Sequence, residues 1–291
     1  MYVITGANGQ TGSVVANTLL SRGQPVRVVL RRAEQAAAWR DRGADVCIAD
    51  VSDEASLIKA FVDADAAYLM NPPAYQADDL LASAGQVHQA MINAAQHVGM
   101  QRVVALSSVG AQHASGTGNI LTTHDFESRL ADSRLQVIVL RAANFIENWA
   151  WFVDGAVASG QLPSMFQPLD RALPMVSVRD IGSTAAALLE ESGTGIVELH
   201  GPEPYSPRDA AAELSRLTGR PIEAVAIPRE AWTGNFRTAG YSDSAIAAFC
   251  EMFDGFNNGL VAFQGTHETR HGVVGLASVL HSLIEQPSRP G

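Results

Sequence analysis

The sequence predicts an α/β fold in which a doubly wound parallel sheet is joined to a smaller α/β unit. Two observations lead to this prediction. Short apolar segments alternate with longer amphipathic ones from residue 1 to about residue 141, which is typical of parallel strands joined by right-handed helical crossovers. The segments at 103–106 and 137–140 are apolar at every position, as expected where helices cover both faces of a sheet.

The first half of the chain alternates strand and helix patterns in a regular order. Each expected strand is a short apolar run, and each expected helix is a longer run with apolar residues three or four positions apart. The strands are expected at 2–5, 25–30, 44–49, 65–70, 101–107 and 135–141. The helices between them are expected near 11–22, 33–41, 54–62, 80–99 and 123–132.

Beyond Arg141 the composition changes. Residues 144–158 are rich in aromatic side chains, and prolines interrupt the stretch that follows. We expect a strand at 176–178 and then a helix at 180–191 capped by Asp180, since an aspartate can accept from the free amides of a first turn. Further strands are expected at 196–200 and 222–227, and helices at 207–218, 242–253 and 273–285.

A glycine-rich turn connects the first expected strand to the first expected helix. Gly6, Gly9 and Gly12 stand three residues apart. In such a turn one glycine allows the tight bend, one lets the backbone approach a phosphate, and one lets the helix pack closely on the strand. An ordinary glycine turn is the alternative. The strand before, the helix after and the second strand favour a Rossmann-type site, with a pyrophosphate at the helix N-terminus.

The end of the second strand indicates which dinucleotide binds. NAD-specific sites place an acidic residue there to bind the ribose 2′-hydroxyl, whereas this chain has Leu30 followed by Arg31 and Arg32. A guanidinium can bind a 2′-phosphate that a carboxylate would repel. The two arginines can also simply face water. With no acid at this position, the sequence favours NADP(H) over NAD(H).

These features divide the chain into two predicted domains. Residues 1–150 form the NADP(H)-binding Rossmann domain, to which residues 174–191 return, and residues 151–291 form a smaller substrate-binding domain. Ligands of such sheets bind beyond the carboxyl ends of the strands. The crevice between the domains is therefore the expected substrate site.

Composition limits the functional classes. The 291 residues are 47% hydrophobic and carry a formal net charge of −10, which argues against direct nucleic-acid binding and against anionic membranes. No apolar run approaches the ~20 residues of a membrane helix, and we expect no secretion, because a strand and not a charged and apolar signal region follows the first residue. Cys47 and Cys250 are isolated, as is typical of thiols in a reducing compartment. We expect a cytoplasmic protein.

Later motifs resemble one family. The chain is similar to atypical short-chain dehydrogenases of the NmrA-like branch, which includes type 2 NAD(P)H:quinone oxidoreductases, triphenylmethane reductase and nucleotide-sensing regulators. The resemblance depends on the glycine turn, Arg31 and a series of later blocks. These are residues 49–51, Leu106 to Gly110, Leu140-Arg141, Asn144-Phe145-x-x-Asn148, Val178-x-Asp180-Ile181-Gly182, residues 201–206 and residues 217–220.

The resemblance implies roles for individual residues. Those assigned to the pyrophosphate turn are Gly6, Asn8, Gly9, Gln10, Thr11 and Gly12, and Arg31 is assigned to the 2′-phosphate. Those assigned to the remainder of the cofactor are Asp50 and Val51 at the adenine, Asn71 and Pro72 towards the nicotinamide, and Ser107, Ser108, Asn144 and Phe145 around the nicotinamide pocket.

The usual catalytic pair of short-chain dehydrogenases is absent. That pair is Tyr-x-x-x-Lys, in which the lysine lowers the pKa of the tyrosine. The tyrosines stand at 2, 68, 75, 205 and 241, away from the helix at 123–132, and Lys59 is the only lysine. Hydride transfer then requires an acceptor that is already electrophilic and stable as a reduced anion. Quinones and cationic conjugated dyes meet this requirement.

Candidate substrate-binding residues are few. Phe145, Trp149, Trp151 and Phe152 can stack on a flat acceptor or can be core residues between the domains. His124 and Ser108 are the candidate catalytic residues, with His124 donating a proton to a quinone oxygen. A lone histidine at a helix start is also a common surface or cap residue.

A zinc-protease pattern occurs near the C-terminus. His267-Glu268-Thr269-Arg270-His271 spells His-Glu-x-x-His, which binds zinc when it lies on a helix. Glycines bracket the motif and no third ligand follows. The resemblance implies a loop here, and we expect no metal site.

Two functions compete. The first is an NADPH-dependent oxidoreductase that transfers hydride to a quinone-like or other conjugated acceptor. The second is a non-catalytic, NADP(H)-sensing regulator with a protein partner, which the missing catalytic pair favours. A sugar-nucleotide epimerase is disfavoured because its chemistry needs the tyrosine. The sequence leaves open whether the chain forms a homodimer.

Overall fold

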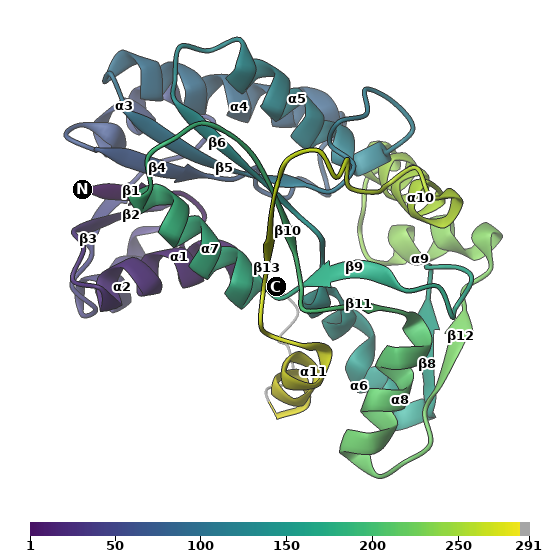
Figure 1. Ribbon diagram of the computed structural model, residues 1–291. Helices are drawn as coiled ribbons and strands as arrows, with labels where there is room; N and C mark the ends of the chain where they lie inside the picture. Colours follow the sequence, from purple (N-terminus) through teal and green to yellow (C-terminus); the bar gives the residue numbers. More distant parts are fainter. Residues whose placement is uncertain (286–291) are drawn as a thin grey trace.

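The computed structural model describes residues 1–285 and is organised around a parallel sheet (Figure 1). Eight strands form it in the order β13-β10-β6-β5-β4-β1-β2-β3, and every neighbouring pair is parallel. The strands are β1 (Tyr2–Ile4), β2 (Val26–Leu30), β3 (Asp45–Ile48), β4 (Ala66–Leu69), β5 (Arg102–Ser108), β6 (Val137–Ala142), β10 (Gly195–His200) and β13 (Glu268–His271). This confirms the predicted fold class.

Helices cover both faces of this sheet. Successive side chains along a strand point to opposite faces, so the apolar residues on each face need a helical layer to bury them. Ile4 lies in the core under one helical layer and Val3 in the core under the other. The first layer contains α1 (Gln10–Ser21), α2 (Ala36–Arg40) and α7 (Val178–Glu190). The second contains α3 (Glu54–Phe61), α4 (Leu80–His97) and α5 (Leu121–Ala131) (Figure 1).

The strand order reverses between β1 and β4. The chain first adds β2 and β3 on one side of β1 and then crosses to add β4, β5 and β6 on the other side. At such a point the connections diverge and leave a crevice at the carboxyl edge of the sheet. The fold therefore provides a ligand site beside the turn between β1 and α1.

Helix α7 returns to the main sheet and packs tightly against α1. A Cβ at Gly182 would lie 2.4 Å from Cβ of Val14, so this glycine permits the close approach. The predicted cap Asp180 is wrong. Ser177 is the N-cap and accepts from the amide of Arg179, which starts the helix two residues earlier, while Asp180 accepts from the amide of Val274.

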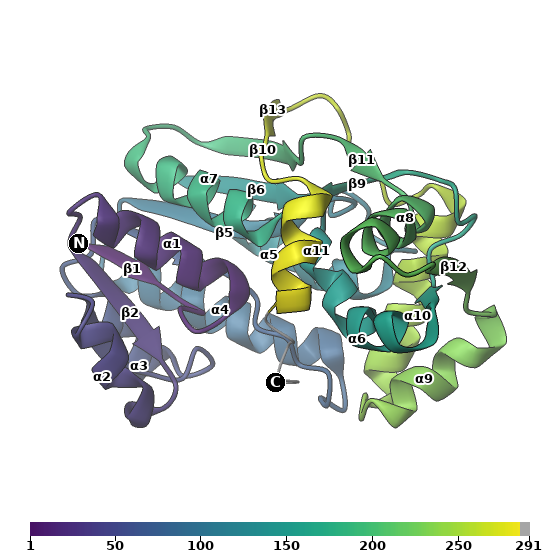
Figure 2. The same cartoon turned by 90° about the horizontal axis from the view of Figure 1, so that it is seen from below.

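The rest of the chain builds a smaller part. One sheet contains β7 (Asn144–Phe145), β9 (Leu173–Val176) and β11 (Pro204–Tyr205), and a second pairs β8 (Gln161–Ser164) with β12 (Glu223–Ala226). The helices are α6 (Ala150–Ser159), α8 (Pro207–Thr218), α9 (Trp232–Thr238), α10 (Asp243–Asn258) and α11 (Leu276–Glu285). Figure 2 shows α11 beside α6 and α8, with α1 and α7 on its other side. Short 3₁₀ turns lie at Ala33–Gln35, Gly118–Ile120, Ile146–Trp149 and Arg229–Ala231.

Two strands from beyond residue 150, β10 and β13, belong to the main sheet. More of the chain after residue 150 thus returns to the Rossmann part than the predicted 174–191. The division into two domains stays a prediction. The strand expected at 176–178 lies three residues earlier, as β9. Among residues 1–285, no helix combines the length and the apolar character needed to cross a membrane.

Candidate functional site

The turn between β1 and α1 forms an anion-binding end of a helix. Gly6 has φ +64°, and the Gly9 amide donates to its carbonyl at 2.8 Å. A Cβ at Gly12 would lie 2.3 Å from that same carbonyl oxygen, so only glycine allows the helix to start this close to the strand. No side chain caps α1 and no acidic residue lies in its first turn. Its amides and its dipole are therefore available to a phosphate.

A cavity of about 600 Å³ opens beside this turn, at the carboxyl ends of β1 to β4. It lies at the reversal of strand order, where the fold predicts a ligand. The structure brings together there eight residues that the sequence assigned to the cofactor. They are Gly6, Asn8, Gly9, Arg31, Asp50, Val51, Asn71 and Pro72.

The charges in this cavity come from Arg31, Arg32 and Asp50. The side chain of Arg31 is exposed and makes no ion pair within residues 1–285, whereas Arg32 lies 3.8 Å from Glu34. Hydrogen bonds from the amide and the hydroxyl of Ser52 lower the pKa of Asp50, with a smaller contribution from Arg31. Arg31 is thus the cation of this cavity that no side chain neutralises directly.

Other predicted cofactor residues have structural partners. Asn8 donates to Gln35 at 2.7 Å and accepts from Trp39 Nε1 at 2.8 Å, which anchors the turn. Gln10, Thr11 and Gly12 form the first turn of α1. Thr11 accepts from the Tyr68 hydroxyl at 2.9 Å, and burial raises the pKa of that tyrosine. Tyr68 is therefore a core residue and not an acid for catalysis.

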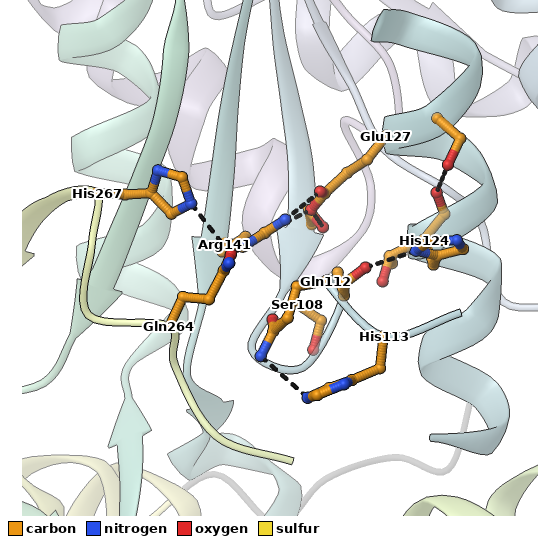
Figure 3. A network of polar contacts seen from close by, with 12 residues as sticks. Ser108, Gln112, His113, His124, Glu127, Arg141, Gln264 and His267 are labelled. Atoms are coloured by element: carbon orange, nitrogen blue, oxygen red, sulfur yellow. Dashed lines mark hydrogen bonds and ion pairs between the residues drawn. The ribbon is translucent and has the colours of Figure 1, made fainter. Parts of the chain in front are cut away.

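A buried polar network occupies the carboxyl ends of β5 and β6 (Figure 3). Arg141 binds both oxygens of Glu127, at 2.9 and 2.6 Å, and Ser107 donates to the same carboxylate. Arg141 also donates to Gln264, which contacts His267 at 3.1 Å. Only 5% of the Arg141 side chain and 12% of that of Glu127 are exposed. The hydroxyl proton of Ser107 is already used in the hydrogen bond to Glu127. The predicted contact of Ser107 with the nicotinamide stays a prediction.

The two candidate catalytic residues lie near this network but are not bonded to each other (Figure 3). Ser108 donates to the Val109 carbonyl at 3.0 Å. His124, in the first turn of α5, is half-buried, and its Nδ1 lies 2.8 Å from the Ala111 carbonyl. A carbonyl can only accept, so Nδ1 carries the proton and Nε2 is left to accept or donate. Neither residue lines the cavity at β1 to β4.

A second cavity, of about 470 Å³, lies within the smaller part, and Tyr75 from the loop after β4 completes its lining. Of the aromatic set predicted for the acceptor, Trp149, Trp151 and Phe152 line it, whereas Phe145 packs against the core of the main sheet. The other aromatic residues around it come from the segment between β4 and α4 and from residues 166–253. They are Tyr75, Phe166, Phe236, Tyr241, Phe249 and Phe253. We call this space the aromatic cavity.

The segment after β4 joins the two cavities. Residues 71–74 line the cavity at the glycine turn, and Tyr75 lines the aromatic cavity. Tyr75 stacks on Tyr241, with ring centroids 4.7 Å apart and planes 13° from parallel. Ser242 holds the segment in place by donating its amide to Tyr75 and its hydroxyl to Ala77. Sequence reasoning missed these tyrosines because both lie in loops, far apart in the chain, where no periodic pattern indicates that they meet.

The histidine motif lies on a strand. Glu268–His271 forms β13 at the edge of the main sheet, so the loop implied by the resemblance is wrong, and His267 lies in the bend just before the strand. The motif is therefore not on a helix, where histidines four residues apart would share one face. In the described part of the chain, no group of three or more metal-ligating residues occurs.

Sequence comparisons place the chain among dinucleotide-binding proteins. The profile of a family described as NAD(P)H-binding matches residues 6–191. The chain is 29% identical over 228 residues to the (4-alkanoyl-5-oxo-2,5-dihydrofuran-3-yl)methyl phosphate reductase of Streptomyces griseus, covering 76% of this chain and 75% of that protein. It is 23% identical over 256 residues to the NAD(P)H azoreductase of Xenophilus azovorans, covering 87% and 86%.

Solved structures share the fold over nearly the whole chain. The NADPH-dependent quinone oxidoreductase QOR2 of Escherichia coli has a TM-score of 0.80 at 23% identity, covering 98% of this chain and 100% of that one. Triphenylmethane reductase of Citrobacter has a TM-score of 0.80 at 19% identity, covering 98% and 99%. These likenesses confirm the predicted Rossmann-type fold and the predicted resemblance to this group of structures.

Proposed function

We propose a function on the premise that this chain belongs to the NAD(P)H-binding family, whose profile matches residues 6–191. This membership bears out the predicted dinucleotide cofactor. The proposed function is an NADPH-dependent oxidoreductase that transfers hydride to a quinone-like or other conjugated electrophilic acceptor. One observation carries the proposal: the segment at 71–75 borders both the cavity at the glycine turn and the aromatic cavity. A dinucleotide and a flat acceptor would therefore meet at this segment.

The cavity at the glycine turn fits the cofactor. The uncapped end of α1 and the close approach of Gly12 to Gly6 form a cradle for a pyrophosphate. Oδ1 of Asn71 is buried and has no partner among residues 1–285, so it can accept from an amide of the nicotinamide end. Arg31 lines the same cavity and would bind a 2′-phosphate, a contact that supports NADPH over NADH.

The residues of the chain orient the reactants and exclude water, and the bound cofactor supplies the hydride. Reduction of a quinone consumes one hydride and one proton, which yields a hydroquinone. Burial raises the pKa of Tyr75, and it raises that of Tyr241 to about 12, so both hydroxyls stay protonated near neutral pH and are weak acids. We infer that water supplies the proton, because His124 lines neither cavity and, with a proton on Nδ1, can donate from Nε2 only as the imidazolium.

The relatives support this reaction class. The four named above are described as reductases of a (4-alkanoyl-5-oxo-2,5-dihydrofuran-3-yl)methyl phosphate, of an azo compound, of a quinone and of a triphenylmethane dye. The reduced products of such acceptors are stabilised by conjugation, so they need no strong acid in the protein. The Ser107–Glu127–Arg141 network is consistent with this, because its charges are already paired.

A regulator that binds NADP(H) without turnover is the second candidate, favoured by the absent tyrosine–lysine pair. Loss of NADPH absorbance with a panel of quinones and azo dyes distinguishes the two functions. We expect turnover with at least one acceptor. Tight NADPH binding without turnover on any acceptor would replace the oxidoreductase with the regulator.

A further inference from the structure

We propose that the aromatic cavity selects uncharged acceptors that carry a hydrogen-bond-accepting oxygen or nitrogen, and that Asn144 and Trp149 recognise this atom. The proposal rests on the proposed function, since it defines the substrate class of the same cavity. It depends on three features of the lining: its charge, its aromatic surfaces and its unpaired N–H groups.

The lining of the aromatic cavity contains no charged residue among those that the structure describes. Its polar members are the uncharged side chains of Asn144, Asn148, Ser164, Asn235 and Thr238, together with the two tyrosines. An ion that enters such a site loses its hydration and finds no opposite charge. The other cavity, in contrast, holds Arg31, Arg32 and Asp50. Phosphate and sulfonate groups are therefore expected at the cofactor cavity and excluded from the aromatic one.

The aromatic surfaces favour a flat molecule. Tyr75 and Tyr241 stack almost in parallel, and Phe249 meets both rings edge-on at 78° and 89°. Such an arrangement presents both ring faces and ring edges to a guest, which are the contacts that aromatic rings prefer. The volume of about 470 Å³ lies within the range of small-molecule sites. A fused two-ring compound fits these dimensions.

Two N–H groups of the lining have no partner within the chain up to residue 285. They are Nδ2 of Asn144, in β7, and Nε1 of Trp149, in the 3₁₀ turn that follows, and both atoms are buried. Oδ1 of Asn144 accepts from Asn148 at 3.0 Å, which leaves its N–H₂ end as the unpaired one. Trp149 is only 4% exposed. Buried donors are rarely left unpaired in native proteins, so an accepting atom of the substrate is the partner that they lack.

The experiment measures binding without turnover, so that it is independent of the proposed reaction. The protein is saturated with NADP⁺, which cannot donate hydride, and is titrated calorimetrically with three two-ring compounds. These are 1,4-naphthoquinone, its 2-sulfonate and naphthalene. We expect the neutral quinone to bind at least about tenfold more tightly than the sulfonate, because the sulfonate must be desolvated without a counter-charge. Equal or tighter binding of the sulfonate, or no binding of the quinone, would overturn the proposal.

Substitution of Trp149 tests the hydrogen bond. Trp149→Phe removes the indole N–H and keeps an aromatic ring, and we expect it to weaken naphthoquinone binding about threefold to tenfold, as for one hydrogen bond. Naphthalene has no accepting atom, so its affinity is expected to change much less. Trp151→Phe, at an exposed residue of the same lining, is the matched control for lost aromatic surface and should change the affinities for naphthoquinone and naphthalene by the same factor.

The alternative of a packing role has a distinct signature. If Trp149 only shapes the cavity, Trp149→Phe weakens quinone and hydrocarbon alike, and the proposed recognition is wrong. Asn144→Leu provides a second, independent variant with the same expectation, should Trp149→Phe fail to fold. If the quinone binds as expected but NADPH reduces none of the acceptors, the oxidoreductase function fails while the binding proposal holds.

Discussion

Replacing Arg31 with alanine tests whether the residue after β2 selects the cofactor. Arg31 lines the cavity at the glycine turn, is exposed, and has no ion pair in the described chain. Its removal breaks no contact that holds the fold together, so the free energy of unfolding should change by no more than about 0.5 kcal/mol. Any larger loss of cofactor affinity therefore reports on binding and not on stability.

The expected magnitude follows from the charge and the exposure of the side chain. A hydrogen bond to a charged group contributes roughly 1.5–3 kcal/mol, and solvent screening at an exposed position favours the lower end. A loss of about 1.5 kcal/mol corresponds to a tenfold rise in the dissociation constant for NADPH. NADH has no 2′-phosphate, so its dissociation constant should rise less than about threefold, which reflects only lost stacking on adenine.

Calorimetric titration of wild type, Arg31→Ala and Arg32→Ala with both dinucleotides measures these constants. Arg32 is the matched control, since it is the neighbouring exposed arginine and lies near Glu34. We expect the Arg31 variant alone to lose its preference for NADPH, and the wild-type preference to shrink at high salt. Equal losses of NADPH and NADH affinity in Arg31→Ala would refute the assignment of Arg31 to the 2′-phosphate.

Three further outcomes are expected. Gly12→Ala should lower Tm and abolish NADPH binding, because its Cβ would lie 2.3 Å from the Gly6 carbonyl oxygen. Gly155→Ala, in α6 with open space, should leave NADPH binding unchanged and should not lower Tm, since alanine favours a helix interior over glycine; equal effects of the two substitutions would contradict the tight turn. Burial lowers the pKa of His88 below 6.5, so the unfolded chain takes up a proton that the folded one resists. The free energy of unfolding should therefore fall as pH drops below about 6.5, and it should fall less in His88→Gln. If the pH profiles of wild type and His88→Gln are parallel, His88 is not the source of this pH dependence. Protein prepared in metal-free buffer should contain no stoichiometric zinc by elemental analysis, and one zinc per chain would overturn the strand assignment of the histidine motif.

The arrangement of the cavity at the glycine turn was predictable because its signals are local. The glycine spacing fixes where β1 ends and α1 begins, and the parallel sheet then brings the ends of β2, β3 and β4 to the same edge. Residues as distant as Gly6 and Asn71 meet for this reason alone. Where two caps competed within a few residues, as at Ser177 and Asp180, the sequence did not distinguish them.

The aromatic cavity was predictable only in part. Trp149, Trp151 and Phe152 lie within four positions in the chain and were expected as a group. Tyr241 meets Tyr75 only because Ser242 and Ser244 bind the segment after β4, at the Ala77 carbonyl and the Leu80 amide. Such tertiary contacts leave no periodic trace in the sequence.

The buried network at β5 and β6 limits the chemistry more than the missing tyrosine does. Glu127 and Arg141 neutralise each other, and Ser107 is held by the same carboxylate. Removing one partner of such a buried pair costs several kcal/mol, roughly 3–5, so none of the three can leave the network to transfer a proton without destabilising the fold. The carboxyl end of β5 is thus a structural support and not a proton source. The proposed function therefore requires an acceptor whose reduced anion is stable in water.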